Sequence, residues 1–147
     1  MRQVIRAENV AKSYGSKEVL KNVNVSVGPG EIFAFLGSNG AGKSTFIDIL
    51  LGLKAPDRGT VEILGHRAGS GKAGRLIGAT PQDISFPPHL KPVELLRLVQ
   101  AHFPEPAKVN DLVRDFGLEQ LMTRQTGGFS GGERRRLALA LAFAGAG

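Results

Sequence analysis

The sequence predicts an α/β fold in which strands come first and helices follow. Apolar residues alternate with polar ones from Val19 to Val27, which is the period of a strand with one buried face. The continuous apolar run Ile32–Leu36 is typical of a strand that is buried on both faces. After the proline-rich stretch Phe86-Pro87-Pro88 the pattern changes to helices. These observations indicate a core domain over residues 1–85 and a helical subdomain over residues 86–147.

Local signals place the elements in order along the chain. Gly28-Pro29-Gly30 forces a turn after the first strand pattern, and a glycine-rich stretch ends the apolar run that follows it. Apolar residues at helical spacing predict a helix over Lys43–Leu53. The remaining predicted elements are strands at Thr60–Leu64 and Leu76–Thr80 and helices at Pro92–Phe103, Pro106–Phe116 and Ser130–Ala144.

Composition limits the class of protein. A chain of 147 residues that is 41% hydrophobic and 22% charged has the size and balance of one globular domain. The absence of cysteine excludes disulfide frameworks, cysteine–zinc modules and thiol nucleophiles. No apolar run approaches the roughly 18 residues of a membrane span, and no signal peptide is recognisable at the start. We therefore expect a soluble chain that works in a reducing compartment.

The charge balance is basic, with 19 Lys and Arg against 13 Asp and Glu and a formal net charge of +6. Such a balance often points to nucleic acid or to a membrane surface. The basic cluster is Arg134-Arg135-Arg136, and no aromatic residues interleave with it as a nucleic-acid stacking surface requires. We interpret the charges as solvated, with one basic helix face, and nucleotides are among the negative partners that fit them.

The stretch with the clearest chemistry follows the buried-strand pattern. A glycine, four residues, then glycine, lysine and a hydroxyl match the phosphate-binding loop, here in the order Gly37, Ser38, Asn39, Gly40, Ala41, Gly42, Lys43 and Ser44. The glycines let backbone N–H groups point inward as a nest for phosphate oxygens, and the helix start adds its positive dipole end. The lysine supplies a cation for the β- and γ-phosphates, and the serine hydroxyl is a ligand for Mg²⁺.

Two other glycine-rich stretches need separate interpretations. In Phe129-Ser130-Gly131-Gly132-Glu133 the spacing of Ser130 and Glu133 forms a capping box, which predicts a helix N-terminus. By itself this indicates an ordinary cap, although the two glycines leave N–H groups open to an anion. Gly69–Gly74 fits a dinucleotide-binding fingerprint, but no strand pattern leads into it, so we expect a solvent loop there.

Taken together, the motifs make the chain resemble the nucleotide-binding domain of ATP-binding cassette (ABC) transporters. Gly37–Thr45 resembles its Walker A loop, and Ser130–Glu133 resembles its signature motif. Thr80-Pro81-Gln82-Asp83 resembles the Q-loop, and Tyr14 lies where the family places its adenine-stacking aromatic residue. The resemblance implies a P-loop NTPase fold of the ABC-cassette type, with an N-terminal antiparallel β subdomain, a Walker A strand–loop–helix core and a helical signature subdomain.

The resemblance also implies ligands and partners. ATP and Mg²⁺ would be bound, with Ser44 and Gln82 at the metal, Gln82 also near the attacking water, and Thr45 completing the loop. The signature residues Ser130, Gly131, Gly132 and Glu133 would act in trans, on the ATP of a second cassette. The other partners would be transmembrane permease subunits, with the chain peripheral at the cytoplasmic face of the cell membrane, and no nucleic acid is expected.

The chain departs from the family pattern after the signature helix. The family continues to Walker B, a strand that ends in Asp-Glu, and to a switch histidine, and neither follows Gly132 here. The histidines at positions 66, 89 and 102 fit surface positions instead. We therefore expect an incomplete cassette with negligible ATP hydrolysis. Because the Walker B strand should neighbour Ile32–Leu36, we also expect that strand to have an open edge, which favours association.

Two alternatives remain open from the sequence. A module that binds nucleotide without hydrolysing it fits the same motifs. A nucleic-acid-linked ABC ATPase fits them less well, because the coiled coil or cysteine-rich zinc insertion of that class is missing between the two motifs.

Ser38 replaces the proline that is common in exporter cassettes. A loop that is lined by backbone tolerates this change.

Overall fold

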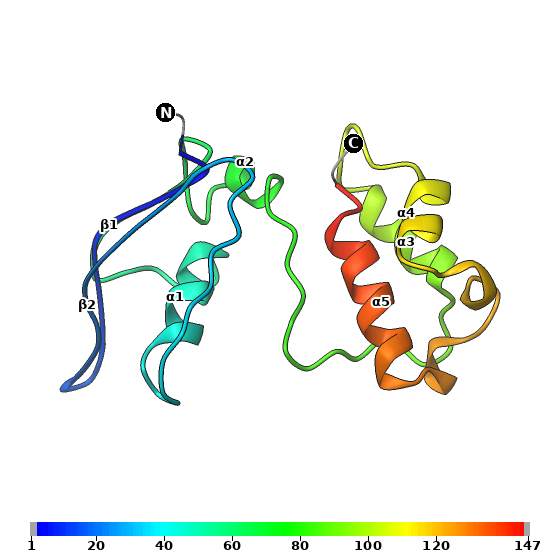
Figure 1. The fold of residues 1–147 in the computed structure, drawn as a ribbon, viewed down its shortest axis with the longest axis horizontal. Coiled ribbons are helices and arrows are strands. Elements are labelled where there is room, and N and C mark those ends of the chain that lie inside the picture. The colour runs from blue at the N-terminus through cyan, green and yellow to red at the C-terminus, as the bar shows by residue number, and fades with distance from the viewer. Residues whose placement is uncertain (1–2, 146–147) are drawn as a thin grey trace. The chain divides into compact units, whose positions relative to one another are not determined.

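The computed structural model describes residues 3–145, which divide into two compact units, one that ends at Leu76 and one that begins at Ile77. The first unit is built from a sheet and two helices, and the second is helical (Figure 1). The assignment of residues 1–85 and 86–147 to a core domain and a helical subdomain of a whole cassette stays a prediction.

The first unit contains an antiparallel sheet with the order β2-β1-β3-β4, formed by β1 (Ile5–Tyr14), β2 (Lys17–Val27), β3 (Arg58–Ile63) and β4 (His66–Arg67). The strands predicted at Val19–Val27 and Thr60–Leu64 are confirmed as parts of β2 and β3. The sequence pattern does not single out β1, because register shifts around Asn9, whose φ is 51°, break its period of two.

Helix α1 (Lys43–Leu50) covers the sheet with one apolar side. Phe46 and Ile49, each 1% exposed, pack with side chains of β1, β2 and β3 into a core whose buried members are Ala7, Val10, Leu20, Phe46, Ile49 and Val61. The predicted helix is therefore confirmed, although it ends before Leu53. Its burial against the sheet holds the residues that precede it, the glycine-rich loop, in place.

The stretch expected to be a solvent loop contains a single helical turn, α2 (Gly71–Gly74). The hydroxyl oxygen of Ser70 accepts a hydrogen bond from the Ala73 N–H at 3.2 Å, and Ala73 is fully buried. The cap by Ser70 and the burial of Ala73 stabilise this turn. The prediction of a loop did not take this cap into account.

Two predicted strands do not form. Ile32–Leu36 and Leu76–Thr80 adopt no regular structure, and Ile32 and Leu36 are 98% and 92% exposed. A strand needs a neighbour to accept its backbone hydrogen bonds, and in residues 3–145 neither segment has one. Of the apolar run, Phe35 is packed, with its ring 5.0 Å from that of Phe46. The expected open edge of a strand is instead an unpaired segment with exposed apolar side chains.

The second unit packs helices around one apolar core, with the elements α3 (Pro92–Gln100), α4 (Val109–Asp115), the 3₁₀ turns η1 (Glu119–Leu121) and η2 (Thr126–Gly128), and α5 (Gly131–Ala142). All three predicted helices are confirmed, each slightly shorter than its pattern. The largest side chains of this core that are entirely buried are Leu96, Leu118 and Leu137. α5 packs against α3 and contributes Leu137 and Ala140 to this core.

Candidate nucleotide-binding site

The glycine-rich loop lies between the unpaired segment and α1. Gly40 and Gly42 have φ values of 82° and 87°, in the left-handed region that favours glycine. Gly42 is the N-cap of α1, and among the residues that the structure describes no side chain caps the first turn of this helix. The first intrahelical bond runs from the Phe46 N–H to the Gly42 carbonyl at 2.9 Å. The N–H groups before Phe46 therefore have no intrahelical partners, which is the arrangement that attracts an anion.

Lys43 is folded back over this loop. Its Nζ donates to the carbonyl oxygens of Gly37 and Ser38, at 2.6 and 2.7 Å, and its side chain is half-buried. The ammonium is thus positioned across the loop, at the start of the helix. Backbone carbonyls hold it there without neutralising its charge, so the loop and the helix start present positive charge on the same side.

Tyr14 ends β1 beside the hairpin turn, and the structure brings it together with α1. Its ring is 46% exposed, and the ammonium of Lys54 lies 5.5 Å from the ring centroid. The pKa of the Tyr14 phenol is lowered, chiefly by Lys54 and to a smaller extent by the hydroxyl of Thr45 and the charge of Lys12. Since Thr45 is in the first turn of α1, the phenol lies next to the predicted Walker A residues.

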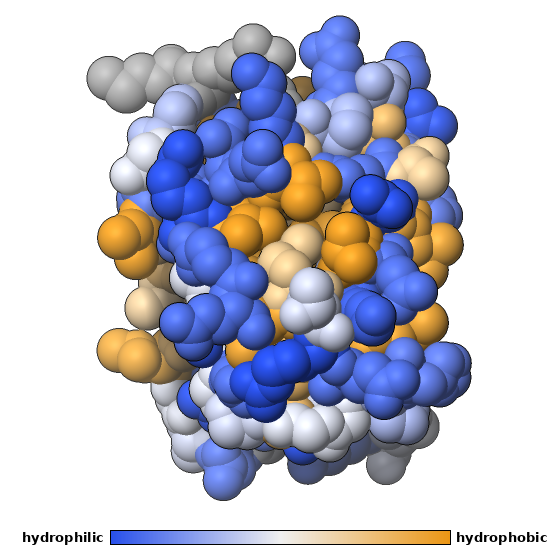
Figure 2. Space-filling model, turned by 90° about the vertical axis from the view of Figure 1, so that its right-hand side faces the viewer, coloured by the Kyte–Doolittle hydropathy of each residue, from blue (hydrophilic) through white to orange (hydrophobic). Residues whose placement is uncertain are grey.

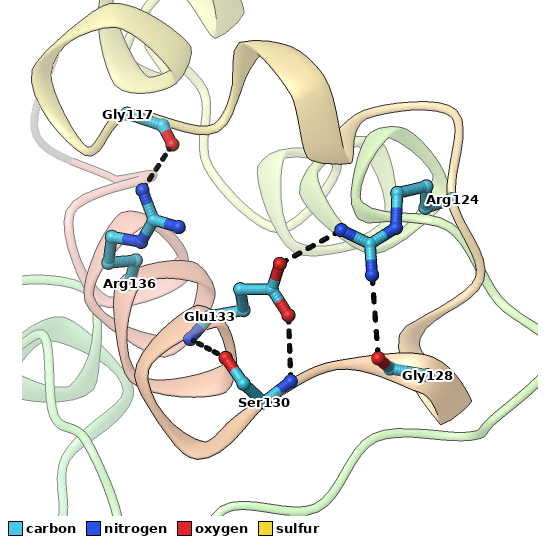
Figure 3. A network of polar contacts seen from close by, with 6 residues as sticks. All are labelled: Gly117, Arg124, Gly128, Ser130, Glu133 and Arg136. Atoms are coloured by element: carbon cyan, nitrogen blue, oxygen red, sulfur yellow. Dashed lines mark hydrogen bonds and ion pairs between the residues drawn. The ribbon is translucent and has the colours of Figure 1, made fainter.

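The capping box predicted at the signature-like stretch is confirmed (Figure 3). The Ser130 hydroxyl accepts from the Glu133 N–H at 3.2 Å, and the Glu133 carboxylate accepts from the Ser130 N–H at 2.7 Å. Hydrogen bonding from the Ser130 N–H, followed by that from Arg124, holds the pKa of Glu133 below its ordinary value. A Cβ built on Gly131 or Gly132 would meet nothing within 4 Å, so the start of α5 is open.

Arg124 lies beside the candidate signature residues, and no sequence pattern predicts its position there. Its guanidinium donates to Glu133 Oε1 at 2.9 Å and to the Gly128 carbonyl at 3.4 Å, which braces the turn before the cap (Figure 3). Arg136 likewise donates to the Gly117 carbonyl at 2.7 Å, so one member of the basic cluster is used inside the unit. No local spacing signals these partners, because they are separated by four to nineteen residues with no regular period.

Gln82, the candidate Q-loop residue, is exposed and lies in an irregular segment of the second unit. Ser44, the candidate metal ligand, is exposed in the first unit. In residues 3–145 no group of three His, Asp or Glu side chains comes together to hold a metal ion. A single hydroxyl is a partial Mg²⁺ site, which suits a metal that also takes its ligands from phosphates and water.

One cavity of the second unit lies away from its candidate site residues Gln82 and Ser130–Glu133. Its volume is about 590 Å³, and it is lined by the apolar residues Leu112, Phe116 and Phe143 together with charged residues such as Lys108 and Asp111. Figure 2 shows the side of this unit that is on the right in Figure 1, with apolar side chains gathered in the middle of a polar surround. Within the part of the chain that the structure describes, no helix is long and apolar enough to cross a membrane.

Comparison with known proteins decides the family. The family model described as "ABC transporter" matches residues 20–146. The chain belongs to this family. The match includes the glycine-rich loop, Gln82 and the capped start of α5, so the resemblance drawn from the motifs and the predicted cassette fold are confirmed.

Relatives give the same assignment over almost the whole chain. The chain is 34% identical over 147 residues to a linearmycin resistance ATP-binding protein of Bacillus subtilis, covering 95% of this chain and 47% of the relative. It is 34% identical to a lipopolysaccharide export system ATP-binding protein of Haemophilus influenzae, covering 96% and 63%. The chain thus spans about half to two thirds of the length of these ABC proteins.

Solved structures share the fold. The ATP-binding subunit of an ABC transporter superposes with a TM-score of 0.85 at 28% identity, covering 97% of this chain and 62% of that one. A dimeric ATP-binding cassette in a post-hydrolysis state, bound to ADP and Pi, superposes with a TM-score of 0.78 at 25% identity, covering 97% and 70%. This ABC chain is accordingly a partial cassette.

Proposed function

We propose that this ABC chain binds Mg·ATP through its glycine-rich loop and that the whole protein couples ATP hydrolysis to transport across a membrane. The observation that carries the proposal is the position of the Lys43 ammonium, held across the loop at an uncapped helix start. Positive charge and free N–H groups on one side of a loop suit a polyphosphate.

Individual residues have distinct roles in this proposal. The backbone of residues 37–42 cradles the β-phosphate, Lys43 contacts the β- and γ-phosphates, and Ser44 gives its hydroxyl to Mg²⁺. The ring of Tyr14 stacks on adenine, since it is half-exposed and next to Thr45. We assign Gln82 to the metal or the attacking water, the role that the family resemblance implies.

We further propose that Ser130, Gly131 and Gly132 contact the nucleotide of a second cassette. The open, capped start of α5 supports this role, because its free side can accept a phosphate. The structural relative bound to ADP and Pi is itself dimeric. Transmembrane permease subunits are the other proposed partners, which places the chain at the cytoplasmic face of a membrane.

The experiment that tests nucleotide binding is titration calorimetry of the 147-residue chain with Mg·ATP. Lys43→Ala removes the loop's ammonium, and a charge-assisted contact is worth about 1.5–3 kcal/mol, so affinity should fall about ten- to a hundredfold. Lys72→Ala removes an exposed lysine on α2 and is the matched control, with an affinity equal to that of the unaltered chain. Equal affinities for the unaltered chain and Lys43→Ala would contradict the proposed site.

A further inference from the structure

Tyr14 has neighbours that the nucleotide-binding motifs do not include. Two ammonium groups lie near its ring, that of Lys54 at 5.5 Å and that of Lys12 at 5.9 Å from the centroid. Each ammonium is tied to a carboxylate, Lys54 to Asp48 at 2.9 Å and Lys12 to Asp57 at 2.7 Å. The aromatic ring is therefore surrounded by lysines whose own positions are set by ion pairs.

The Lys54 pair is anchored more fully than its surface position suggests. The backbone N–H groups of Leu53 and Lys54 both donate to the Asp48 carbonyl, at 2.8 and 3.2 Å, while the Lys54 side chain returns to the Asp48 carboxylate. Asp48 thus holds Lys54 by main chain and side chain at once. Because Asp48 is one turn after Thr45 on α1, the helix that begins at the phosphate-binding loop also places Lys54.

The second lysine near the ring, Lys12, and the end of β1 are fixed by Asp57. The Asp57 carboxylate accepts from Lys12 and from the Ser13 N–H, both at 2.7 Å, and the Asp57 N–H donates to the Ala11 carbonyl at 2.9 Å. These bonds pin the end of the strand that carries Tyr14. Fixing the backbone that carries a ligand-binding side chain before the ligand arrives removes part of the entropy cost of binding.

We propose that Asp48 and Lys54 form a positioning pair that presents the Tyr14 ring to the base of a nucleotide whose phosphates occupy the loop. Lys54 lies beside Tyr14, whereas Lys43 contacts the phosphates. Lys54 therefore affects binding of the base, through the Tyr14 ring, and does not affect binding of the phosphates. This inference rests on the proposed function, because it assumes that a nucleotide binds. It adds two residues, Asp48 and Lys54, that no sequence motif of the site contains.

The chain supplies its own probe for this contact, since it contains one tyrosine and no tryptophan. Phenolate absorbance in a pH titration therefore reports on Tyr14 alone. Lys54 is the largest cause of the lowered phenol pKa, so Lys54→Met should raise that pKa and Lys54→Arg should keep it low. Lys21→Met removes a lysine of the same unit that is 73% exposed and pairs with Glu18, and it should leave the pKa unchanged.

Comparing the affinities for Mg·ATP and for inorganic tripolyphosphate distinguishes positioning of the Tyr14 ring from a general electrostatic effect of the lysine. Lys54→Met should weaken Mg·ATP binding about three- to tenfold and leave the affinity for inorganic tripolyphosphate unchanged, because only ATP carries a base to stack. Asp48→Asn should weaken ATP binding in the same way. Lys54→Arg keeps the cation beside the ring, so this variant should bind ATP as the unaltered chain does. Lys21→Met should change neither affinity.

The outcomes distinguish this inference from the proposed function. If Lys54→Met binds ATP as tightly as the unaltered chain, or weakens ATP and tripolyphosphate equally, the positioning pair is wrong while nucleotide binding stands. If the phenol pKa does not move in Lys54→Met, the contact with Tyr14 is wrong. If the unaltered chain binds neither ATP nor tripolyphosphate, the proposed function fails and this inference fails with it.

Discussion

At the scale of single residues, the loop depends on glycine for two different reasons. Gly40 and Gly42 share a left-handed backbone, with φ of 82° and 87°. A Cβ on Gly40 would meet nothing within 4 Å, whereas a Cβ on Gly42 would lie 2.7 Å from Leu20 Cδ2 and 2.9 Å from the Val19 carbonyl oxygen. Gly42 is therefore needed for conformation and for close packing of α1 on β2, and Gly40 for conformation alone.

This difference predicts unequal stability losses for two matched substitutions. Gly40→Ala should cost about 1–2 kcal/mol, the strain of a left-handed alanine. Gly42→Ala should cost about 1–3 kcal/mol more, because the added methyl group overpacks the junction between helix and strand. Urea unfolding followed by circular dichroism measures both. Equal losses in the two variants would show that the contact with Leu20 and Val19 relaxes freely.

At the scale of elements, the start of α5 is held by charge as well as by capping. The carboxylate of Glu133 accepts from the Ser130 N–H and pairs with Arg124, and both interactions favour its ionised form. The pKa of Glu133 is consequently lower in the folded chain than in the unfolded chain. Protonation of Glu133 therefore weakens both the helix cap and the ion pair with Arg124.

The sign of this pKa shift predicts how stability depends on pH. A depressed carboxyl pKa contributes stability that is fully present above the ordinary glutamate value of about 4.3 and is lost as the pH falls through the lower pKa of the folded state. Glu133→Gln should remove that part of the acid sensitivity. Glu119→Gln, at an exposed glutamate of η1, is the control. Urea midpoints measured from neutral pH down to about pH 3 compare them, and parallel curves for all three chains would contradict the assignment.

At the scale of the whole molecule, the apolar segment Ile32–Leu36 pairs with no strand among residues 3–145, and of its side chains Phe35 is packed, against Phe46. A segment apolar at every position suits burial on both faces, yet Ile32 and Leu36 are almost fully exposed. Burial of exposed apolar surface against any covering surface is favourable by about 25 cal/mol per Å². In a polypeptide of these 147 residues, a second copy is available to do so.

We therefore expect this polypeptide to self-associate as its concentration rises. The double variant Ile32→Lys with Leu36→Lys should stay monomeric over the same range, because lysine disfavours burial and pairing at an exposed edge. Leu98→Lys, at a 59% exposed leucine on α3, is the control and should associate like the unaltered chain. Sedimentation velocity at several concentrations measures the effect. A monomeric unaltered chain at every concentration would contradict this prediction.

Features that depend on neighbours along the chain can be predicted from the amino-acid sequence. The glycine-rich loop ahead of α1, the capping box of Ser130 and Glu133, the strand at Val19–Val27 and the three helices of the second unit all follow from spacing within a few residues. Features that depend on distant partners emerge only in the folded chain. Ile32–Leu36 has the composition of a strand but no neighbouring strand among residues 3–145, and β1 pairs despite its broken period. Arg124 and Lys54 reach Glu133 and Tyr14 only through the fold. The physical reason is that caps and turns satisfy their hydrogen bonds locally, whereas strands and ion-paired side chains need groups that only folding brings near.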